Sequence, residues 1–361
     1  MKKILFAISP SVEQGGAQKV FFLTVRELSK MNCELTVILP DNTLFSGLKQ
    51  YNVNIRVVNF HSVKSPLIIH QIIKEGNFDL INTYLPKGSL LISIVNLFHR
   101  IPMCCTLLNA IIHVKIGRLK RVVYPFLYYA LFKLCDGFIV NSEQNKQHFM
   151  DTAGINGDFI KVIYSGIDIK EFITVPVQAV AKNKFTIGFV GRLSIEKGPA
   201  CLIAALKNLK GVDYECLIVG DGPIRSELEG YVSKNNLDGK VKFLGFQNEI
   251  AKVMHLMDVV VVPSLNETFG LTVIEAFALK KAVIASNVGG IPELVSDKRT
   301  GLLFQANDDL ALSERISYIY NNKGKAKGMG ENGYNLLMRD FTMTTMAENT
   351  LNYFNSLMLK S

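Results

Sequence analysis

The stretch Glu267-Thr-Phe-Gly-Leu-Thr-Val-Ile-Glu275 decides how this chain is interpreted. Before it, Val259–Val262 is a run of four valines, which predicts a fully buried strand. The apolar residues of positions 271–279 recur at helical spacing, so we expect Glu275 within a helix and Glu267 in the loop before it. A helix N-terminus that follows Gly270 is suited to binding an anion. Two carboxylates beside an anion site suit a ligand that carries both hydroxyls and phosphates, as a nucleotide sugar does.

Short apolar runs alternate with amphipathic stretches along the whole chain of 361 residues. This alternation predicts an α/β fold with parallel, doubly wound sheets, and the length favours two domains. We therefore expect two Rossmann-like domains joined by a linker at residues 170–184, where Pro176 lies in a stretch without periodicity. A final helix is predicted at residues 343–359. The predicted strands are residues 4–8, 35–39, 55–58, 80–82, 103–107, 138–140, 160–163, 186–190, 214–219, 241–244, 259–262 and 282–285.

The bulk composition is that of a globular protein with an anionic partner. A formal net charge of +9 fits an anionic substrate, nucleic acid or an anionic membrane surface. Nucleic acid is disfavoured, because the sequence has no zinc-finger spacing, basic zipper or aromatic-glycine RNA motif. The six cysteines form no CxxC pair and fall in apolar patterns, so they are predicted to be reduced and buried. No apolar run is long enough for a transmembrane helix or a signal peptide, and we expect a cytoplasmic protein.

Three further loops of the second half follow predicted strands. Gly191-Arg192 and Lys197-Gly198 bound a loop on which an arginine and a lysine can grip a diphosphate, although a solvated basic turn has the same composition. Gly220 ends the next strand and can let the backbone approach a ligand, or can simply serve a tight turn. Phe246 ends a third strand, where its backbone could meet a nucleotide base.

The first half contributes weaker signals. Gly15-Gly16 links the first strand to the first helix and can admit a phosphate or an acceptor sugar, or act as a flexible connector, but the GxGxxG dinucleotide fingerprint is missing. His113 follows the strand at residues 103–107 and could act as a base or bind a sugar, or be an ordinary surface histidine. Residues 115–133 combine five basic residues with an aromatic run, which is typical of a helix on an anionic membrane or of a crossover helix with a basic rim.

Taken together, these motifs resemble those of the retaining glycosyltransferases of family 4, which have the GT-B fold. The resemblance rests on Gly191-Arg192 with Lys197-Gly198, on Val219-Gly-Asp-Gly-Pro223, on Pro263-Ser264, on Glu267 and Glu275, and on Gly289-Gly-Ile-Pro-Glu293. In the first half, Gly15-Gly16-Ala17 and Ser165-Gly166-Ile167-Asp168 agree with it. The resemblance spans nearly the whole chain.

The family implies two Rossmann-like domains that face each other across a cleft. Residues 1–169 would bind the acceptor and residues 185–342 the nucleotide-sugar donor, and the last helix, within residues 343–361, would cross back to the first domain. Retention would proceed by front-face attack of the acceptor hydroxyl, with the donor phosphate as base. No cofactor or metal is implied, because the basic pair and the helix N-terminus would neutralise the leaving diphosphate.

The family also implies roles for individual residues. Arg192 and Lys197 would bind the donor diphosphate, Glu267 the donor sugar, and Glu275 the ribose. Donor contacts would also come from backbone at Gly191, Gly220, Phe246, Phe269, Gly270 and Leu271, and from Gly15 and Gly16 in the first domain. Leu108 stands where many members have a histidine; His113 could replace it, and Asn109 is a further candidate for contact with the sugar or acceptor.

The expected activity is transfer of a hexose or N-acetylhexosamine from a UDP-sugar to a glycan or polyprenyl-linked acceptor, as in bacterial surface polysaccharide synthesis, with the enzyme at the inner face of the cell membrane. Two alternatives stay open. A sugar-nucleotide 2-epimerase of the GT-B fold would bind the same donor, and the missing histidine at Leu108 would fit a catalytically idle scaffold subunit.

Overall fold

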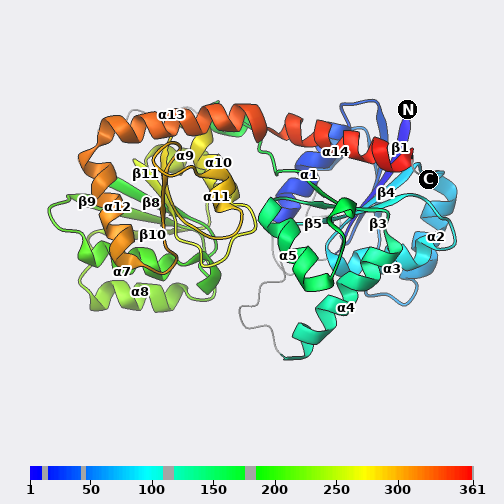
Figure 1. The fold of residues 1–361 in the computed structure, drawn as a ribbon, viewed down its shortest axis with the longest axis horizontal. Coiled ribbons are helices and arrows are strands. Elements are labelled where there is room, and N and C mark those ends of the chain that lie inside the picture. The colour runs from blue at the N-terminus through cyan, green and yellow to red at the C-terminus, as the bar shows by residue number, and fades with distance from the viewer. Residues whose placement is uncertain (10–14, 42–45, 109–117, 175–183, 360–361) are drawn as a thin grey trace. The chain divides into compact units, whose positions relative to one another are not determined.

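The computed structural model describes residues 1–9, 15–41, 46–108, 118–174 and 184–359. The chain forms two compact units (Figure 1). The first comprises Met1–Gly166 together with Met343–Ser361, and the second comprises Ile167–Thr342. Residues 170–173 of the expected linker form helix α6 (Lys170–Ile173), with Phe172 buried, whereas residues 175–183 lie outside the described residues.

The first unit is built on a parallel seven-stranded sheet in the order β3-β2-β1-β4-β5-β6-β7. The strands are β1 (Lys2–Ile8), β2 (Cys33–Leu39), β3 (Val53–Val57), β4 (Leu80–Tyr84), β5 (Met103–Leu107), β6 (Gly137–Val140) and β7 (Ile160–Val162). The helices are α1 (Gly16–Leu28), α2 (Ser65–Gly76), α3 (Pro86–Asn96), α4 (Arg118–Leu134), α5 (Glu143–Ala153) and α14 (Met343–Met358), with the 3₁₀ turns η1 (Ser46–Gln50) and η2 (Gly157–Phe159).

The second unit is built on a parallel six-stranded sheet in the order β10-β9-β8-β11-β12-β13. The strands are β8 (Phe185–Val190), β9 (Tyr214–Val219), β10 (Val241–Gly245), β11 (Val259–Val262), β12 (Ala282–Ser286) and β13 (Leu302–Phe304). Besides α6, the helices are α7 (Pro199–Asn208), α8 (Arg225–Lys234), α9 (Ile250–His255), α10 (Leu271–Ala278), α11 (Ile291–Leu294), α12 (Asp309–Asn321) and α13 (Lys323–Asp340), with the 3₁₀ turn η3 (Ile195–Lys197).

These two sheets confirm the predicted pair of Rossmann-like domains, and all twelve predicted strands are present. The central strands are largely apolar because helices cover both faces of each sheet; every residue of β11, for example, is buried. The strand β13 was not predicted, because a three-residue run of Leu302–Phe304 carries no readable alternation.

The strand order places a switch point in each sheet. In the second unit the chain winds outward from β8 in one direction to β10 and in the other direction from β11 to β13. The chain therefore continues from β8 and from β11 toward opposite edges of the sheet, and the loops that follow these two strands lie at the carboxyl edge, which is where ligands bind in open α/β sheets. In the first unit the corresponding switch lies between β1 and β4.

The last helix completes the core of the first unit. Helix α14 lies beside α1 (Figure 1), and its Phe354 is fully buried with its ring centroid 6.0 Å from that of Phe6 on β1. The six cysteines are all free and buried, as predicted. Among the described residues, no helix is both long and apolar enough to cross a membrane.

Candidate functional site

At the switch point of the second unit, the loops that leave β8 and β11 are fastened together by backbone contacts. The N–H of Leu265 donates to the carbonyl of Glu196 at 2.8 Å. Gly198 has a φ of +64°, and a Cβ at this position would lie 2.0 Å from the carbonyl oxygen of Pro263. Only glycine allows this approach, so the basic loop and the loop that precedes α10 form one rigid surface.

An ion pair joins the two loops at this surface. The Nζ of Lys197 lies 2.5 Å from Oε2 of Glu267, and the side chains are 36% and 13% exposed. The Ser264 hydroxyl lies 3.5 Å from the same carboxylate oxygen and is buried. The structure thus brings together two residues that the sequence separates by 70 positions. A lysine and a carboxylate held side by side present a cation for phosphate and an acceptor for hydroxyl groups.

Arg192 adds a second positive charge to the basic loop. Arg192 is exposed and lies directly after β8 and Gly191. The nearby carboxyl of Glu196 has its pKa lowered, chiefly by a hydrogen bond from the Ser194 side chain and one from its own backbone, with smaller contributions from the charges of Arg192 and Lys197. Both cations therefore act on the same short loop, where their fields add to attract an anion.

Helix α10 begins at the end of the second loop. Gly270, with a φ of +109°, is its N-cap, and Leu271 is its first residue, as the sequence predicts. Phe269 is buried against the ring of Phe341 at a centroid distance of 5.8 Å. Glu275 lies one turn into the helix and is 8% exposed. The backbone N–H groups of the first turn and a nearly buried carboxylate are thus both presented by one helix.

Two further glycines allow the neighbouring loops to approach the site. Gly289, at a φ of +54°, would place a Cβ 1.7 Å from the carbonyl oxygen of Glu267, and the N–H of Gly290 donates to that same carbonyl at 3.1 Å. Gly220, at a φ of +125°, would place a Cβ 1.9 Å from the carbonyl oxygen of Gly191. The backbone of Glu267 is therefore held from the β12 side, and the backbone of Gly191 from the β9 side.

The remaining candidates are placed as follows. Phe246 directly follows β10, and its side chain is 71% exposed, so an aromatic face is open to solvent at the carboxyl edge of this sheet. In the first unit, Gly16 opens α1 and the N–H of Gly15 donates to Oε1 of Gln18 at 2.9 Å; both glycines are exposed. Asn109 and His113 lie outside the described residues, while Leu108 is buried.

Two hydroxyls near the site were not among the candidates from the sequence. Ser264 faces Glu267, and the Thr272 hydroxyl donates to the carbonyl of Val190 at 3.3 Å, which ties α10 to the end of β8. Thr272 lies within the decisive stretch and Ser264 just before it. Serine and threonine are so common in loops and helix starts that spacing alone could not assign a role to either residue.

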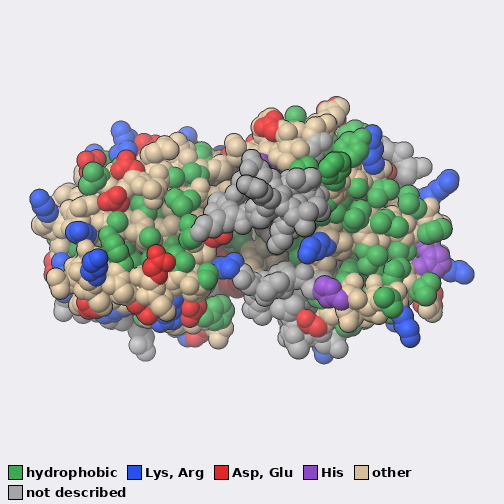
Figure 2. Space-filling view, turned by 90° about the horizontal axis from the view of Figure 1, so that it is seen from below, with side chains coloured by type: hydrophobic (Ala, Val, Ile, Leu, Met, Phe, Trp, Pro, Cys, Tyr) green, Lys and Arg blue, Asp and Glu red, His purple; other side chains and the backbone are tan. Residues whose placement is uncertain are grey.

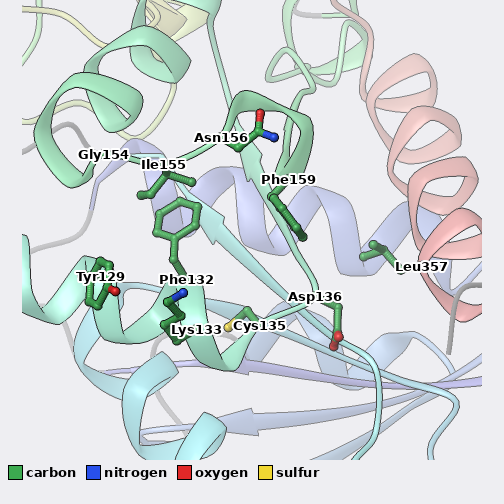
Figure 3. A pocket seen from close by; sticks show the side chains of 10 residues that line it. All are labelled: Tyr129, Phe132, Lys133, Cys135, Asp136, Gly154, Ile155, Asn156, Phe159 and Leu357. Carbon is green, nitrogen blue, oxygen red and sulfur yellow. The ribbon is translucent and has the colours of Figure 1, made fainter.

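A separate cavity of about 570 Å³ opens in the first unit (Figure 3). It lies near the amino ends of β6 and β7, between the end of α4 and the segment that follows α5. Its lining residues are Tyr129, Phe132, Lys133, Cys135, Asp136, Gly154, Ile155, Asn156, Phe159 and Leu357. Because ligands of open α/β sheets bind at the carboxyl edge, this cavity is distinct from the site predicted by the sequence.

Two family descriptions match the chain in succession. "Glycosyltransferase Family 4" matches residues 14–171, and "Glycosyl transferases group 1" matches residues 173–336. The second match contains the whole candidate site of the second unit, from Gly191 to Glu275.

Curated relatives are named as enzymes that transfer sugars. A protein named as an uncharacterised glycosyltransferase of Methanocaldococcus jannaschii is 37% identical over 175 residues, which cover 48% of this chain and 47% of that protein. The chain thus spans about half the length of this relative. The N,N'-diacetylbacillosaminyl-diphospho-undecaprenol alpha-1,3-N-acetylgalactosaminyltransferase of Campylobacter jejuni is 27% identical over 338 residues, which cover 85% of this chain and 87% of that protein.

Among solved structures, Anabaena Alr3699/HepE in complex with UDP-glucose matches with a TM-score of 0.85 and 24% identity, covering 99% of this chain and all of that one. At that identity the likeness concerns the fold. It confirms the expected GT-B class, with two parallel-sheet Rossmann-like domains.

Proposed function

This chain belongs to the glycosyltransferases of family 4, and we propose that it transfers a hexose or N-acetylhexosamine from a nucleoside-diphosphate sugar to a glycan acceptor with retention of configuration. The observation that carries the proposal is the Lys197–Glu267 pair at the switch point of the second unit, with Arg192 on the same loop. A diphosphate needs cations and a donor sugar needs hydrogen-bond acceptors, and this surface presents both side by side.

The donor is assigned to this surface part by part. Lys197 and Arg192 bind the diphosphate, together with the N–H groups at the start of α10. Glu267 accepts hydrogen bonds from sugar hydroxyls, and Glu275 does so from the ribose. Phe246, with its exposed ring, and the backbone at Gly220 lie at the neighbouring strand ends, where they contact the nucleoside. The family resemblance also assigns Gly15 and Gly16, at the start of α1, to donor binding.

The proposed reaction is front-face displacement. The acceptor hydroxyl attacks the anomeric carbon on the face from which the diphosphate departs, the bond between that carbon and the phosphate oxygen breaks, and the proton of the hydroxyl passes to the departing phosphate. The chain positions the reactants and stabilises the negative charge that develops on the leaving group through Lys197, Arg192 and the N-terminus of α10. With these groups in place, no metal or other cofactor is invoked.

The acceptor is proposed to be a polyprenyl-diphosphate-linked glycan of bacterial surface polysaccharide synthesis, used at the inner face of the cell membrane. Names of relatives support this class: besides the Campylobacter enzyme, a protein of Escherichia coli that is 24% identical over 297 residues is named as a UDP-Gal:alpha-D-GlcNAc-diphosphoundecaprenol alpha-1,3-galactosyltransferase. The name of the Escherichia coli protein supports UDP as the nucleotide of the donor.

A ligand screen followed by an isotope experiment tests the proposal. We expect UDP to raise the melting temperature in the presence of EDTA, and the shift to be lost in Arg192→Ala, since a ligand that binds only the folded state stabilises it. Labelled sugar from the donor should then appear in an undecaprenyl-diphosphate-linked acceptor. Label that appears only as a 2-epimer of the donor, or protein that binds no nucleoside diphosphate, would contradict the proposal in favour of an epimerase or of an idle scaffold.

A further inference from the structure

One face of the first unit exposes an unusual number of large hydrophobic side chains. Of the eighteen such side chains exposed among the described residues, nine lie between Val57 and Tyr129. Eight of these nine lie on or beside helices α2, α3 and α4: Val63 (95% exposed), Leu67 (73%), Ile68 (42%), Ile94 (46%), Leu97 (57%), Phe98 (80%), Phe126 (70%) and Tyr129 (53%). Figure 2, which views the molecule from the side on which α3 and α4 lie in Figure 1, shows hydrophobic side chains gathered over this unit.

These side chains form one surface because the three helices pack in order, with α3 between α2 and α4. The ring of His70 on α2 lies 6.4 Å from that of Phe98, and its Nδ1 lies 3.0 Å from Nε2 of His99. Leu67 lies one turn before His70, and Ile94, Leu97 and Phe98 follow helical spacing. The exposed residues of α2 and α3 therefore meet, and we call this surface, with Phe126 and Tyr129 of α4, the α2–α4 face.

The exposed apolar side chains of the α2–α4 face are not core residues that point to solvent because the helices are rotated. The opposite sides of the same helices already fill the core: Ile69, Ile92 and Leu131, one from each helix, are fully buried. Helices that are apolar on the core side as well as on the outer side are typical of proteins with a second apolar environment. Exposed apolar patches of this kind mark contact with a partner or a membrane.

The positive charge around the α2–α4 face favours an anionic partner. Residues 58–134, which span the three helices, contain nine lysines and arginines but only two acidic residues, Glu75 and Asp79. This segment therefore contributes +7 of the net charge of +9. Four exposed cations flank the described part of the face, and none of them forms an ion pair with another described residue: Lys64, Lys74, Lys87 and Arg100. Aromatic and aliphatic side chains ringed by unpaired cations fit a bilayer that contains anionic lipid.

We propose that the α2–α4 face docks the first unit on an anionic lipid bilayer, with Leu67, Leu97, Phe98 and Phe126 entering the interface and the surrounding lysines and arginines binding lipid phosphates. This inference deepens the proposed function, since docking brings the enzyme to the membrane that contains a lipid-linked acceptor, but its physical basis does not depend on catalysis. It also extends the docking segment beyond residues 115–133 to α2 and α3, which sequence composition did not indicate.

Vesicle binding in the absence of any sugar substrate tests the inference. Co-sedimentation with vesicles of phosphatidylethanolamine and phosphatidylglycerol should be strong for the wild-type chain, weaker with neutral phosphatidylcholine vesicles, and weaker at high salt. The double variant Leu97→Ser, Phe98→Ser should bind at least about tenfold more weakly, because two large side chains lose their burial. The matched control Leu310→Ser, Met338→Ser removes two exposed hydrophobic side chains of the second unit, 63% and 46% exposed, and should bind as the wild type does.

A charge-reversal variant and a folding control complete the experiment. Lys64→Glu, Lys74→Glu, Arg100→Glu should abolish the preference for anionic vesicles, and every variant should keep its melting temperature and its stabilisation by UDP. Wild-type vesicle binding in both face variants would overturn the proposal. Absence of vesicle binding, with self-association of the wild type that Leu97→Ser, Phe98→Ser abolishes, would overturn it in favour of an interface between copies of the chain. Transfer to a water-soluble acceptor, measured separately, reports on the proposed function alone.

Discussion

Replacing Lys197 with methionine removes the ammonium from the switch-point surface while keeping most of the length of the side chain. In the structure that ammonium lies 2.5 Å from the Glu267 carboxylate, and the two side chains are 36% and 13% exposed. A hydrogen bond between charged groups contributes about 1.5–3 kcal/mol, and the exposure of Lys197 to solvent places this pair near the lower figure, at about 1.5 kcal/mol. The melting temperature of the second unit should therefore fall by about 3–6 °C.

The effect on ligand binding should be larger than the effect on stability. If Lys197 binds the diphosphate, its loss should weaken UDP binding by about 1.5–3 kcal/mol, which is a rise in Kd of roughly 10–100-fold. Glu267→Gln removes the same ion pair but leaves the ammonium, so it should lower transfer without weakening UDP binding. Isothermal titration with UDP and urea unfolding of each variant separate the two effects.

The chain offers a matched control in a second lysine pair of the same unit. The Nζ of Lys242 lies 2.7 Å from Glu215, with side chains 57% and 30% exposed. Lys242→Met should cost less than about 1 kcal/mol of stability, as exposed pairs do, and should leave UDP binding unchanged. Equal UDP affinity in Lys197→Met and Lys242→Met would refute the assignment of Lys197 to the diphosphate.

Three further outcomes follow from the geometry. Gly289→Ala should lower the free energy of unfolding of the second unit by about 2 kcal/mol or more and abolish transfer, because its Cβ would lie 1.7 Å from the Glu267 carbonyl oxygen. Gly211→Ala, with a φ of +68° but no atom within 4 Å, should lower it by only about 1 kcal/mol, as measured by urea unfolding. Burial raises the pKa of Cys105 to about 11, so this thiol should resist Ellman's reagent at about pH 8 until the protein is denatured. Burial, and to a smaller extent the charges of His70 and Lys74, lower the pKa of His99 below its ordinary 6.5, so the folded state favours the neutral ring. The resulting contribution to the free energy of unfolding is present above the pKa that His99 has in the unfolded chain, and it is lost as the pH falls below that value. Urea unfolding at about pH 7.5 and about pH 5 should accordingly show a larger loss for the wild type than for His99→Gln, and equal losses would contradict the assignment.

The strands could be predicted well from the sequence because buried strands consist of short runs of mostly apolar residues. Val259–Val262 and Met103–Leu107 have the predicted bounds, since strands buried on both faces carry few polar residues. Helix α13 was harder to foresee, because it contains four glycines in its first eleven residues. Two of its glycines have a packing reason: a Cβ at Gly330 would lie 2.0 Å from the Lys280 carbonyl, and one at Gly333 would lie 2.3 Å from the Phe277 ring.

The site was predictable residue by residue but not as an arrangement. Glu267 and Lys197 could each be selected from its own loop, yet their contact depends on the pairing of β8 with β11, which no local pattern specifies. The α2–α4 face shows the same limit. Leu97 and Phe98 look like core residues in the sequence, because hydrophobic periodicity cannot tell which of two apolar sides of a helix will be covered.

The return of α14 to the first unit has a consequence for the order in which the chain folds during synthesis. The second unit is one continuous segment, Ile167–Thr342, whereas the first needs segments that lie on both sides of it in the sequence. Phe354, fully buried against Phe6, is synthesised after the whole of the second unit. The amino-terminal half must therefore wait with an incomplete core while the half made after it can already fold, which reverses the usual order of domain folding from the N-terminus.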